Sequence, residues 1–159
     1  MSEIVLVVAI ADNGVIGKDG GIPWHISGDM KRFKALTTGH TVVMGRKTWV
    51  SLPRKPLPNR KNVVCTRDAE WSAPGAVRAT LQDIDLSYIA PNQALMVIGG
   101  EEIYRYFLPR AHRIELTEVH RDFEGDAKFA FDRSGWHETA REDHVTADGL
   151  GYSYVTLTR

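Results

Sequence analysis

Two segments carry the residue types that bind phosphate groups. Residues 43–48 (VMGRKT) place a glycine and two cations after an apolar run, and residues 97–100 (VIGG) place a glycine pair after another. If each glycine begins a helix, the free backbone N–H groups of the first turn can face an anion, and the cations add attraction. Tight turns without any ligand explain the glycines of either segment equally well.

A third apolar run ends in Thr66 and Arg67, where a hydroxyl beside a guanidinium can hold a further phosphate. Taken by itself, this pair is better explained as the solvated end of a strand. None of the three segments has the glycine spacing of the GxGxxG fingerprint, so the sequence does not predict a Rossmann-type dinucleotide site.

Asp29 is the carboxylate with the most unusual surroundings. It falls in the first turn of a predicted helix, between Trp24 and Phe33. The helix dipole favours acids in the first turn, and this would be the better explanation without the two aromatic neighbours. A carboxyl in an apolar cleft tends to have a raised pKa and can supply or organise a proton. We therefore expect Asp29 to take part in acid–base chemistry.

Other chemistries find little support. The six histidines are scattered without metal-ligand spacing, so we expect no metal and exposed histidine side chains. Ser27 and Ser51 lack the context of a nucleophile elbow. Cys65, the one cysteine, lies in a predicted strand and is expected to be an inert buried thiol.

Composition limits the class of protein. The 159 residues favour a single domain over residues 1–159, and 20 basic against 20 acidic residues give no net attraction to nucleic acid or an anionic membrane. A single cysteine cannot form an internal disulfide, which fits a reducing compartment. The longest apolar run, residues 4–11, is too short to span a bilayer, and it lacks the pattern of a signal peptide. We expect a cytoplasmic protein.

Hydrophobic patterning predicts the elements that position these residues. Continuous apolar runs predict buried strands at residues 4–11, 41–44, 62–66 and 95–98, with a weaker strand at 76–79. Alternating patterns predict strands at residues 112–119 and 151–158. Helices are expected at residues 28–37 with Ser27 as the cap, at 46–52, at 101–108, and from Thr80 through Leu86.

The order of these elements predicts the fold class. Repeated strand–glycine–helix units indicate a mostly parallel sheet, and the two late strands, with no helix between them, indicate an antiparallel edge. We expect an α/β domain of three layers, with a central mixed, mostly parallel sheet flanked by helices. Ligands of such sheets bind at the carboxyl ends of the strands, and the long glycine-rich loop at residues 14–21 is a candidate lid.

Five groups of motifs span nearly the whole chain. They are residues 14–17 (GVIG) and 22–24 (IPW) with Asp29 and Phe33; 43–49 (VMGRKTW); 57–62 (LPNRKN); 97–100 (VIGG) with Tyr104; and 123–126 (FEGD). Each is modest alone, and their combination in this order is highly specific. Together they resemble the signatures of dihydrofolate reductases of the bacterial type, and the resemblance implies that family's fold.

The resemblance implies NADPH-dependent reduction of 7,8-dihydrofolate to 5,6,7,8-tetrahydrofolate, a step of one-carbon metabolism. A hydride would reach the pterin ring while Asp29 organises protonation. The resemblance also implies a monomer that binds antifolates such as trimethoprim. The implied catalytic residues are Asp29, Trp24, Thr117 and Tyr104. The implied substrate-binding residues are Val7, Val8, Asp29, Met30, Phe33, Leu52, Leu57, Arg60 and Thr117. The implied NADPH-binding residues are Ala9, Ile16, Gly17, Gly45, Arg46, Lys47, Thr48, Thr66, Arg67, Ile98, Gly99, Gly100 and Tyr104.

Individual roles follow from the same resemblance. Asp29 and Thr117 would anchor the pteridine ring, and Arg60 would pair with a carboxylate of the glutamate tail. Gly99 and Gly100 would be joined by a cis peptide bond, and the loop at residues 12–24 would form a lid steadied by Asp126. The phosphates would be held in two groups: Arg46, Thr66 and Arg67 at the adenosine phosphate, and Lys47 and Thr48 at the pyrophosphate.

Three positions depart from the family pattern. Ser27 stands where many bacterial members have proline, Ile22 where many have methionine, and Glu101 where a third glycine is frequent. None of these changes removes an implied catalytic group. They bear on the lid and on inhibitor affinity more than on the reaction.

Two other interpretations stay open from the residues alone. A pyrimidine reductase of riboflavin synthesis would share the NADPH half but would not need Trp24, Asp29 and Arg60 together. A non-catalytic nucleotide-binding module would have no use for an acid flanked by aromatic residues next to a lid.

Overall fold

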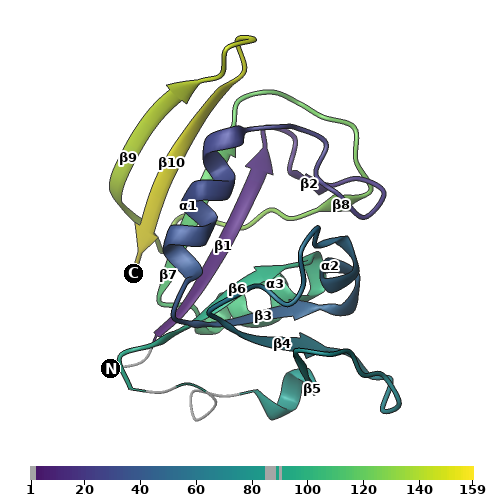
Figure 1. The fold of residues 1–159 in the computed structure, drawn as a ribbon. Helices are drawn as coiled ribbons and strands as arrows, with labels where there is room; N and C mark the ends of the chain where they lie inside the picture. Colours follow the sequence, from purple (N-terminus) through teal and green to yellow (C-terminus); the bar gives the residue numbers. More distant parts are fainter. Residues whose placement is uncertain (1–2, 85–88, 90) are drawn as a thin grey trace.

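The computed structural model describes residues 3–84, 89 and 91–159, which contain one large sheet of eight strands (Figure 1). The strand order across the sheet is β5-β4-β3-β6-β1-β7-β10-β9. Neighbouring strands are parallel, except that β10 is antiparallel to both β7 and β9. The strand bounds are β1 Glu3–Ala11, β3 Thr41–Gly45, β4 Lys61–Cys65, β5 Ala76–Ala79, β6 Ala94–Gly99, β7 Arg113–Val119, β9 His137–Val145 and β10 Gly151–Thr158.

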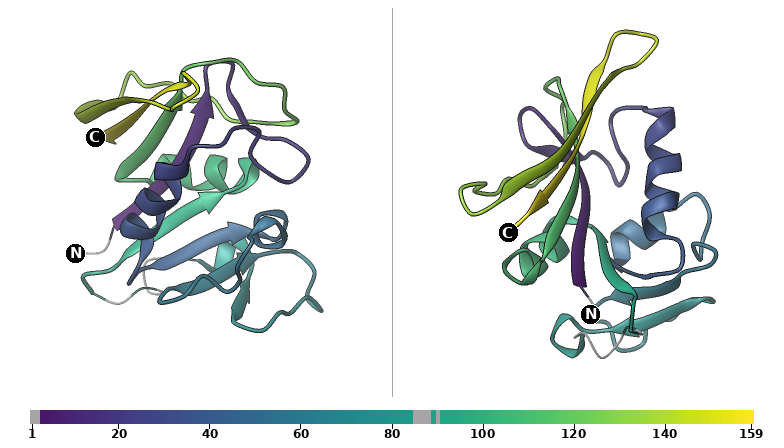
Figure 2. Two further views of the ribbon diagram at one scale, coloured as in Figure 1. Left: turned by 45° about the horizontal axis from the view of Figure 1, so that its top comes forward. Right: turned by 90° about the vertical axis from the view of Figure 1, so that its left-hand side faces the viewer.

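Helices on both faces of the sheet confirm the expected three-layer α/β fold. On one face lie α1 (Ser27–Thr37) and α2 (Arg46–Ser51), and on the other lies α3 (Glu101–Phe107) (Figure 2, right). The central strands β1, β3 and β6 contain continuous apolar runs. Because successive side chains of a strand point to opposite faces, these runs make both faces of the sheet apolar. One set packs with Phe33 and Trp49, and the other packs with Ile103 and Phe107.

The loop at residues 12–24 is held by a small second sheet that the sequence did not predict. In it, β2 (Val15–Gly17) pairs antiparallel with β8 (Ala127–Lys128). The backbone N–H of Asp126 donates to the Gly17 carbonyl at 3.1 Å, and the Asp126 carboxylate accepts the N–H of Asp19 at 3.3 Å. A Cβ on Gly125 would lie 2.5 Å from the Gly17 carbonyl oxygen, so this close approach requires glycine.

Two expected element features were wrong, and one strand of the large sheet was not predicted. The helix expected from Thr80 is only a 3-10 turn, η1 (Leu81–Asp83), and Leu86 lies outside the described residues. Ser27 does not cap α1: it is the first helical residue, Ile26 precedes it, and no side-chain hydrogen bond caps the helix. The missed strand is β9, in which every residue except His144 is exposed, so no apolar alternation reveals it.

The histidines and the third helix also differ from expectation in detail. His40 and His144 are partly buried rather than exposed. The ring of His40 accepts the backbone N–H of Ala94 at 2.9 Å, which explains its position at the sheet. After α3, a 3-10 turn η3 (Leu108–Arg110) continues the chain through Pro109.

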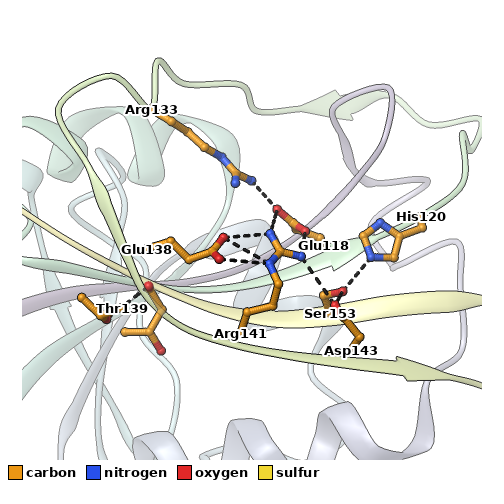
Figure 3. A network of polar contacts seen from close by, with 9 residues as sticks. Glu118, His120, Arg133, Glu138, Thr139, Arg141, Asp143 and Ser153 are labelled. Carbon is orange, nitrogen blue, oxygen red and sulfur yellow. Dashed lines mark hydrogen bonds and ion pairs between the residues drawn. The ribbon is translucent and has the colours of Figure 1, made fainter.

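A network of polar contacts ties the edge strand β9 to the sheet, on the face that points away from α1 (Figure 3). Glu118 of β7 lies 2.9 Å from both Arg133 and Arg141. Partial burial raises the pKa of Glu118, but hydrogen bonds from the two arginines outweigh it and hold that pKa below the usual range. Nearby, the Ser153 hydroxyl donates to Asp143 at 2.5 Å. Charged side chains on an edge strand also oppose pairing with another chain.

Candidate active site

Asp29 lies in the first turn of α1 and contacts the sheet. Thr117 of β7, 3% exposed, donates its hydroxyl to Oδ1 of Asp29 at 3.1 Å. Burial raises the pKa of the Asp29 carboxyl above its ordinary value, and the Thr117 hydrogen bond and the positive charge of Arg32 offset only part of that rise. A carboxyl in such a setting can hold or pass a proton.

The register of the sheet fixes the place of Thr117. Its neighbours across the strands are Ala9 of β1 and Tyr154 of β10. Because side chains alternate along strands, these three positions share the face that α1 covers. They lie toward the carboxyl ends of the parallel strands β1 and β7, where open α/β sheets bind ligands.

Tyr104 reaches the same region from α3, in the opposite layer. Its buried hydroxyl donates to the carbonyl oxygen of Val7 at 2.8 Å. Burial and, after it, the negative charge of Asp29 raise the pKa of Tyr104, so the hydroxyl stays protonated. Tyr104 and Asp29 therefore lie close enough to interact electrostatically.

A glycine pair links β6 to α3. Gly99 and Gly100 are joined by a cis peptide bond, as the resemblance implied. Gly99 has a φ of +130°, and a Cβ placed on it would lie 3.4 Å from the hydroxyl oxygens of both Thr48 and Tyr104. A side chain at Gly99 would therefore contact both hydroxyls, and the positive φ favours glycine at this position.

The cationic residues predicted to bind phosphate lie at two neighbouring strand ends. Gly45 of β3 and Cys65 of β4 are register partners, so the residues that follow them, Arg46 and Thr66, leave the sheet side by side. Arg46 and Lys47 are exposed at the start of α2. Arg67 is exposed as well and forms an ion pair with Glu102 at 3.2 Å, a partner that the sequence did not predict.

The apolar residues predicted to line the cleft are distributed over both faces of the sheet. Met30 on α1 is 67% exposed. Ile16 and Gly17, in β2, belong to the loop. Val8 lies in the cluster packed with α3, on the face away from Asp29. Ala9 packs against a third cluster, which contains Trp24. The cluster under α1 contains Val7, Phe33, Leu52, Leu57 and Ile98.

Arg60 is held in place by the protein itself. Its Nε donates to the Pro58 carbonyl at 2.9 Å, and its Nη1 donates to the Thr37 hydroxyl at 2.9 Å. Burial lowers the pKa of the Arg60 guanidinium, which remains a cation at neutral pH. A guanidinium fixed in this way is suited to bidentate binding of a carboxylate.

Trp24 ends the loop and packs into the protein. It is buried, and its ring centroid lies 5.2 Å from that of Phe123. A cavity of about 410 Å³ on this side is lined by Trp24, Arg121 and Asp148, among others, but not by Asp29. The site of Asp29 is therefore separate from this cavity.

The structure also bears on thiol chemistry, metal binding and membrane insertion. Cys65 is buried, and burial raises its pKa to about 12, so it is an inert thiol at neutral pH. Among the described residues, no group of three or more His, Cys, Asp or Glu could hold a metal ion. In the same part of the chain, no helix is both long and apolar enough to cross a membrane.

Comparison with known proteins decides the family. The family model described as "Dihydrofolate reductase" matches residues 3–159. The chain belongs to the dihydrofolate reductase family. It is accordingly an NADPH-dependent enzyme that reduces dihydrofolate, and the pyrimidine reductase and the non-catalytic module are set aside.

Several dihydrofolate reductases match over the full length. One from Neisseria meningitidis serogroup A is 43% identical over 161 residues, covering 100% of this chain and 99% of that protein. The type 3 reductase of Salmonella typhimurium is 43% identical over 98% of both chains, and that of Bacillus subtilis is 39% identical over 97% and 92%. The structure of the Enterococcus faecalis reductase, complexed with NADP(H) and RAB-propyl, has a TM-score of 0.87 at 30% identity, covering 99% of this chain and 96% of that one.

Three groups near Asp29 were missed by the sequence analysis. Arg32 lies on α1, and it contacts Glu115 of β7 and Tyr154 of β10 on the side of the sheet that faces the helix. Two signals were available: Arg32 follows Asp29 by one helical turn, and Glu115 precedes Thr117 by two residues in a strand. The contacts of Arg32 with Glu115 and Tyr154 depend on strand register and on the position of α1, which the sequence alone does not give.

Proposed function

We propose that Asp29 organises the proton that the reduction of dihydrofolate consumes. The observation that supports this most is the partly buried Asp29 carboxyl with a raised pKa, fixed by Thr117 at the carboxyl edge of the sheet. NADPH supplies the hydride when it is bound. Asp29 holds the pteridine ring and relays a proton, through water, toward the ring nitrogen, while Thr117 keeps the carboxylate oriented.

The residues proposed to hold NADPH divide by the part of the dinucleotide they face. Ala9, Ile16, Gly17, Ile98 and Tyr104 surround the nicotinamide, and Gly45, Lys47, Thr48, Gly99 and Gly100 line the pyrophosphate. Arg46, Thr66 and Arg67 hold the adenosine phosphate, in which case Arg67 exchanges Glu102 for a doubly charged anion. Trp24, at the end of the loop, excludes water from the reacting rings.

The substrate tail is proposed to leave the cleft past α1. Val7 and Leu52 lie beside the pterin, whereas Val8, whose side chain is buried on the opposite face, does not. Met30, Phe33 and Leu57 form the wall against the aminobenzoyl group. Arg60, held by Pro58 and Thr37, binds a carboxylate of the glutamate. Antifolates with a cationic diaminopyrimidine ring pair with Asp29 in the same place. The related E. faecalis reductase with NADP(H) and RAB-propyl bound supports such a site.

The same proposal includes the setting of the enzyme. The chain forms one domain over residues 1–159, acts as a monomer and works in the cytoplasm. Balanced charge, with 20 basic and 20 acidic residues, supports a small-molecule enzyme without a nucleic-acid or membrane partner.

The role of Asp29 is tested by Asp29→Asn, which keeps the side-chain shape and removes the ionisable group. Turnover is followed by the loss of NADPH absorbance with dihydrofolate added, and folding by thermal unfolding. Positioned proton transfer contributes about 100- to 10,000-fold, so we expect a folded variant with turnover reduced by that factor at neutral pH. Turnover within a few-fold of the unmodified enzyme contradicts the proposal.

A further inference from the structure

A buried ion pair lies beside the catalytic acid. Nη2 of Arg32 donates to Oε2 of Glu115 at 3.1 Å, and the two side chains are 18% and 5% exposed. Glu115 also accepts the Thr156 hydroxyl at 2.7 Å and lies 3.5 Å from Nη1 of Arg113. A buried ion pair is often no more stabilising than apolar side chains of the same size, so stability alone does not account for it.

The spacing of residues on α1 and β7 places this ion pair next to Asp29. Asp29 and Arg32 are three residues apart on α1 and therefore share a face of the helix. Their partners, Thr117 and Glu115, are two residues apart on one face of β7, a spacing of roughly 6.6 Å. Two adjacent contacts thus fasten α1 to β7, and one of them places a cation beside the carboxylate.

Tyr154 of β10 fixes the guanidinium from a second direction. It is the register partner of Thr117, and its ring centroid lies 4.3 Å from Cζ of Arg32. A cation over an aromatic face is attracted by the ring quadrupole. Burial and then the negative charge of Asp29 raise the pKa of Tyr154 to about 12, so this neighbour stays neutral at physiological pH.

The charged and titratable groups around Asp29 come from four elements. Arg32 lies on α1, Glu115 on β7, Tyr154 on β10 and Tyr104 on α3. The two tyrosines are neutral, and Glu115 is engaged by Arg32. Burial raises the pKa of Asp29, and the positive charge of Arg32 acts against that rise.

We propose that Arg32 is a positioning residue of this reductase: held by Glu115 and Tyr154, its guanidinium keeps the Asp29 carboxylate ionised and seated on Thr117. The inference rests on the proposed role of Asp29. Reduction of the C=N bond adds a hydride from NADPH and one proton that comes ultimately from solvent. The fixed positive charge of Arg32 lowers the pKa of the Asp29 carboxyl and that of the nearby pterin ring nitrogen. Because reduction needs a proton at this site, Arg32 sets the pH above which the rate of reduction falls.

The test replaces Arg32 with glutamine. The readout is the ¹³C NMR titration of the Asp29 carboxyl in the ligand-free enzyme, assigned by its disappearance in Asp29→Asn. Loss of the Arg32 charge, one helical turn from Asp29, is expected to raise the titration midpoint of the Asp29 carboxyl on the order of one pH unit. The alkaline limb of the pH profile for hydride transfer is expected to move upward by a similar amount. Arg32→Lys, which keeps a cation, should restore both, and Arg105→Gln, an exposed change on α3, should alter neither.

Two further arms keep the test decisive. If Arg32→Gln unfolds because Glu115 is left with Arg113 alone, Arg32→Gln is made in a Glu115→Gln background. The upward shift is then expected relative to Glu115→Gln by itself. A folded variant in which the Asp29 midpoint stays within a few tenths of a pH unit of the original overturns the proposal. A purely structural role would lower the rate at every pH without moving the limb, which also overturns it. If Asp29→Asn proves fully active, the role of Asp29 fails, yet the titration still reports whether Arg32 controls its charge.

Discussion

The hydrogen bond from Thr117 to Asp29 allows a direct test of the site, because the hydroxyl group can be replaced with little change in the shape of the side chain. Thr117→Val replaces the hydroxyl with a methyl group and leaves the partly buried Asp29 carboxylate without that donor. The hydroxyl lowers the pKa of Asp29, against the dominant effect of burial. Its loss must therefore raise that pKa further.

The distance sets the size of the effect. At 3.1 Å the bond is long for a hydroxyl donating to a carboxylate, so its strength belongs at the low end of charged hydrogen bonds. About 1.5 kcal/mol corresponds to a rise of about one pH unit in the Asp29 midpoint. The ¹³C titration of the Asp29 carboxyl measures it, with Thr117→Ser as the control that keeps the hydroxyl.

The raised pKa of Asp29 also determines how the free energy of unfolding depends on pH. An acid whose pKa is higher in the folded than in the unfolded state binds more protons when folded, so the free energy of unfolding falls as pH rises. Thr117→Val should therefore lose about 1.5 kcal/mol at neutral pH, and the loss should shrink as pH is lowered through the raised Asp29 pKa. An unchanged Asp29 midpoint in a folded Thr117→Val protein would refute this reasoning.

Three further predictions concern the edges of the site. Tyr104→Phe leaves a buried carbonyl without its donor and should lower the free energy of unfolding by about 1–3 kcal/mol, measured by denaturant titration; no loss would contradict the 2.8 Å bond. Replacing Arg46 and Arg67 together with alanine should weaken NADPH far more than NADH in equilibrium binding, because charge-assisted bonds are worth about 1.5–3 kcal/mol each, and equal weakening would remove their role. A Cβ on Gly28 would lie 3.5 Å from the Tyr154 hydroxyl, an ordinary contact, so Ser27→Pro with Gly28→Ala should fold. That double change should lower the trimethoprim inhibition constant by roughly 10- to 200-fold with a smaller change in the Michaelis constant for dihydrofolate, and an unchanged inhibition constant would discard the idea.

The strands at the centre of the sheet could be predicted from the sequence because both of their faces are buried. β1, β3 and β6 contain short continuous apolar runs rich in β-branched residues, a pattern typical of strands buried on both faces. β9 could not be predicted in the same way, since it is a charged edge strand held by its backbone pairing with β10 and by the contacts of Glu118 with Arg141. Edge strands bury little, so their side chains carry little signal.

The site could be predicted where local sequence determines it and not where distant strands meet. Asp29 was identified from its place in a helix turn between aromatic residues, whereas Thr117 entered only through the family resemblance. Arg32 and Glu115 escaped because their pairing depends on how α1 lies across β7, 83 residues further along the chain. The ion pair between Arg67 and Glu102 escaped for the same reason.

The central claim is that Asp29 organises the proton for reduction of the pterin ring. The most direct measurement is the single-turnover rate of hydride transfer as a function of pH, in the unmodified enzyme and in Asp29→Asn, with both ligands saturating. Since burial raises the pKa of Asp29, we predict that the unmodified rate falls with rising pH around a midpoint above the ordinary aspartate range, and that this break is absent from Asp29→Asn. The same break at the same pH in both proteins would contradict the account.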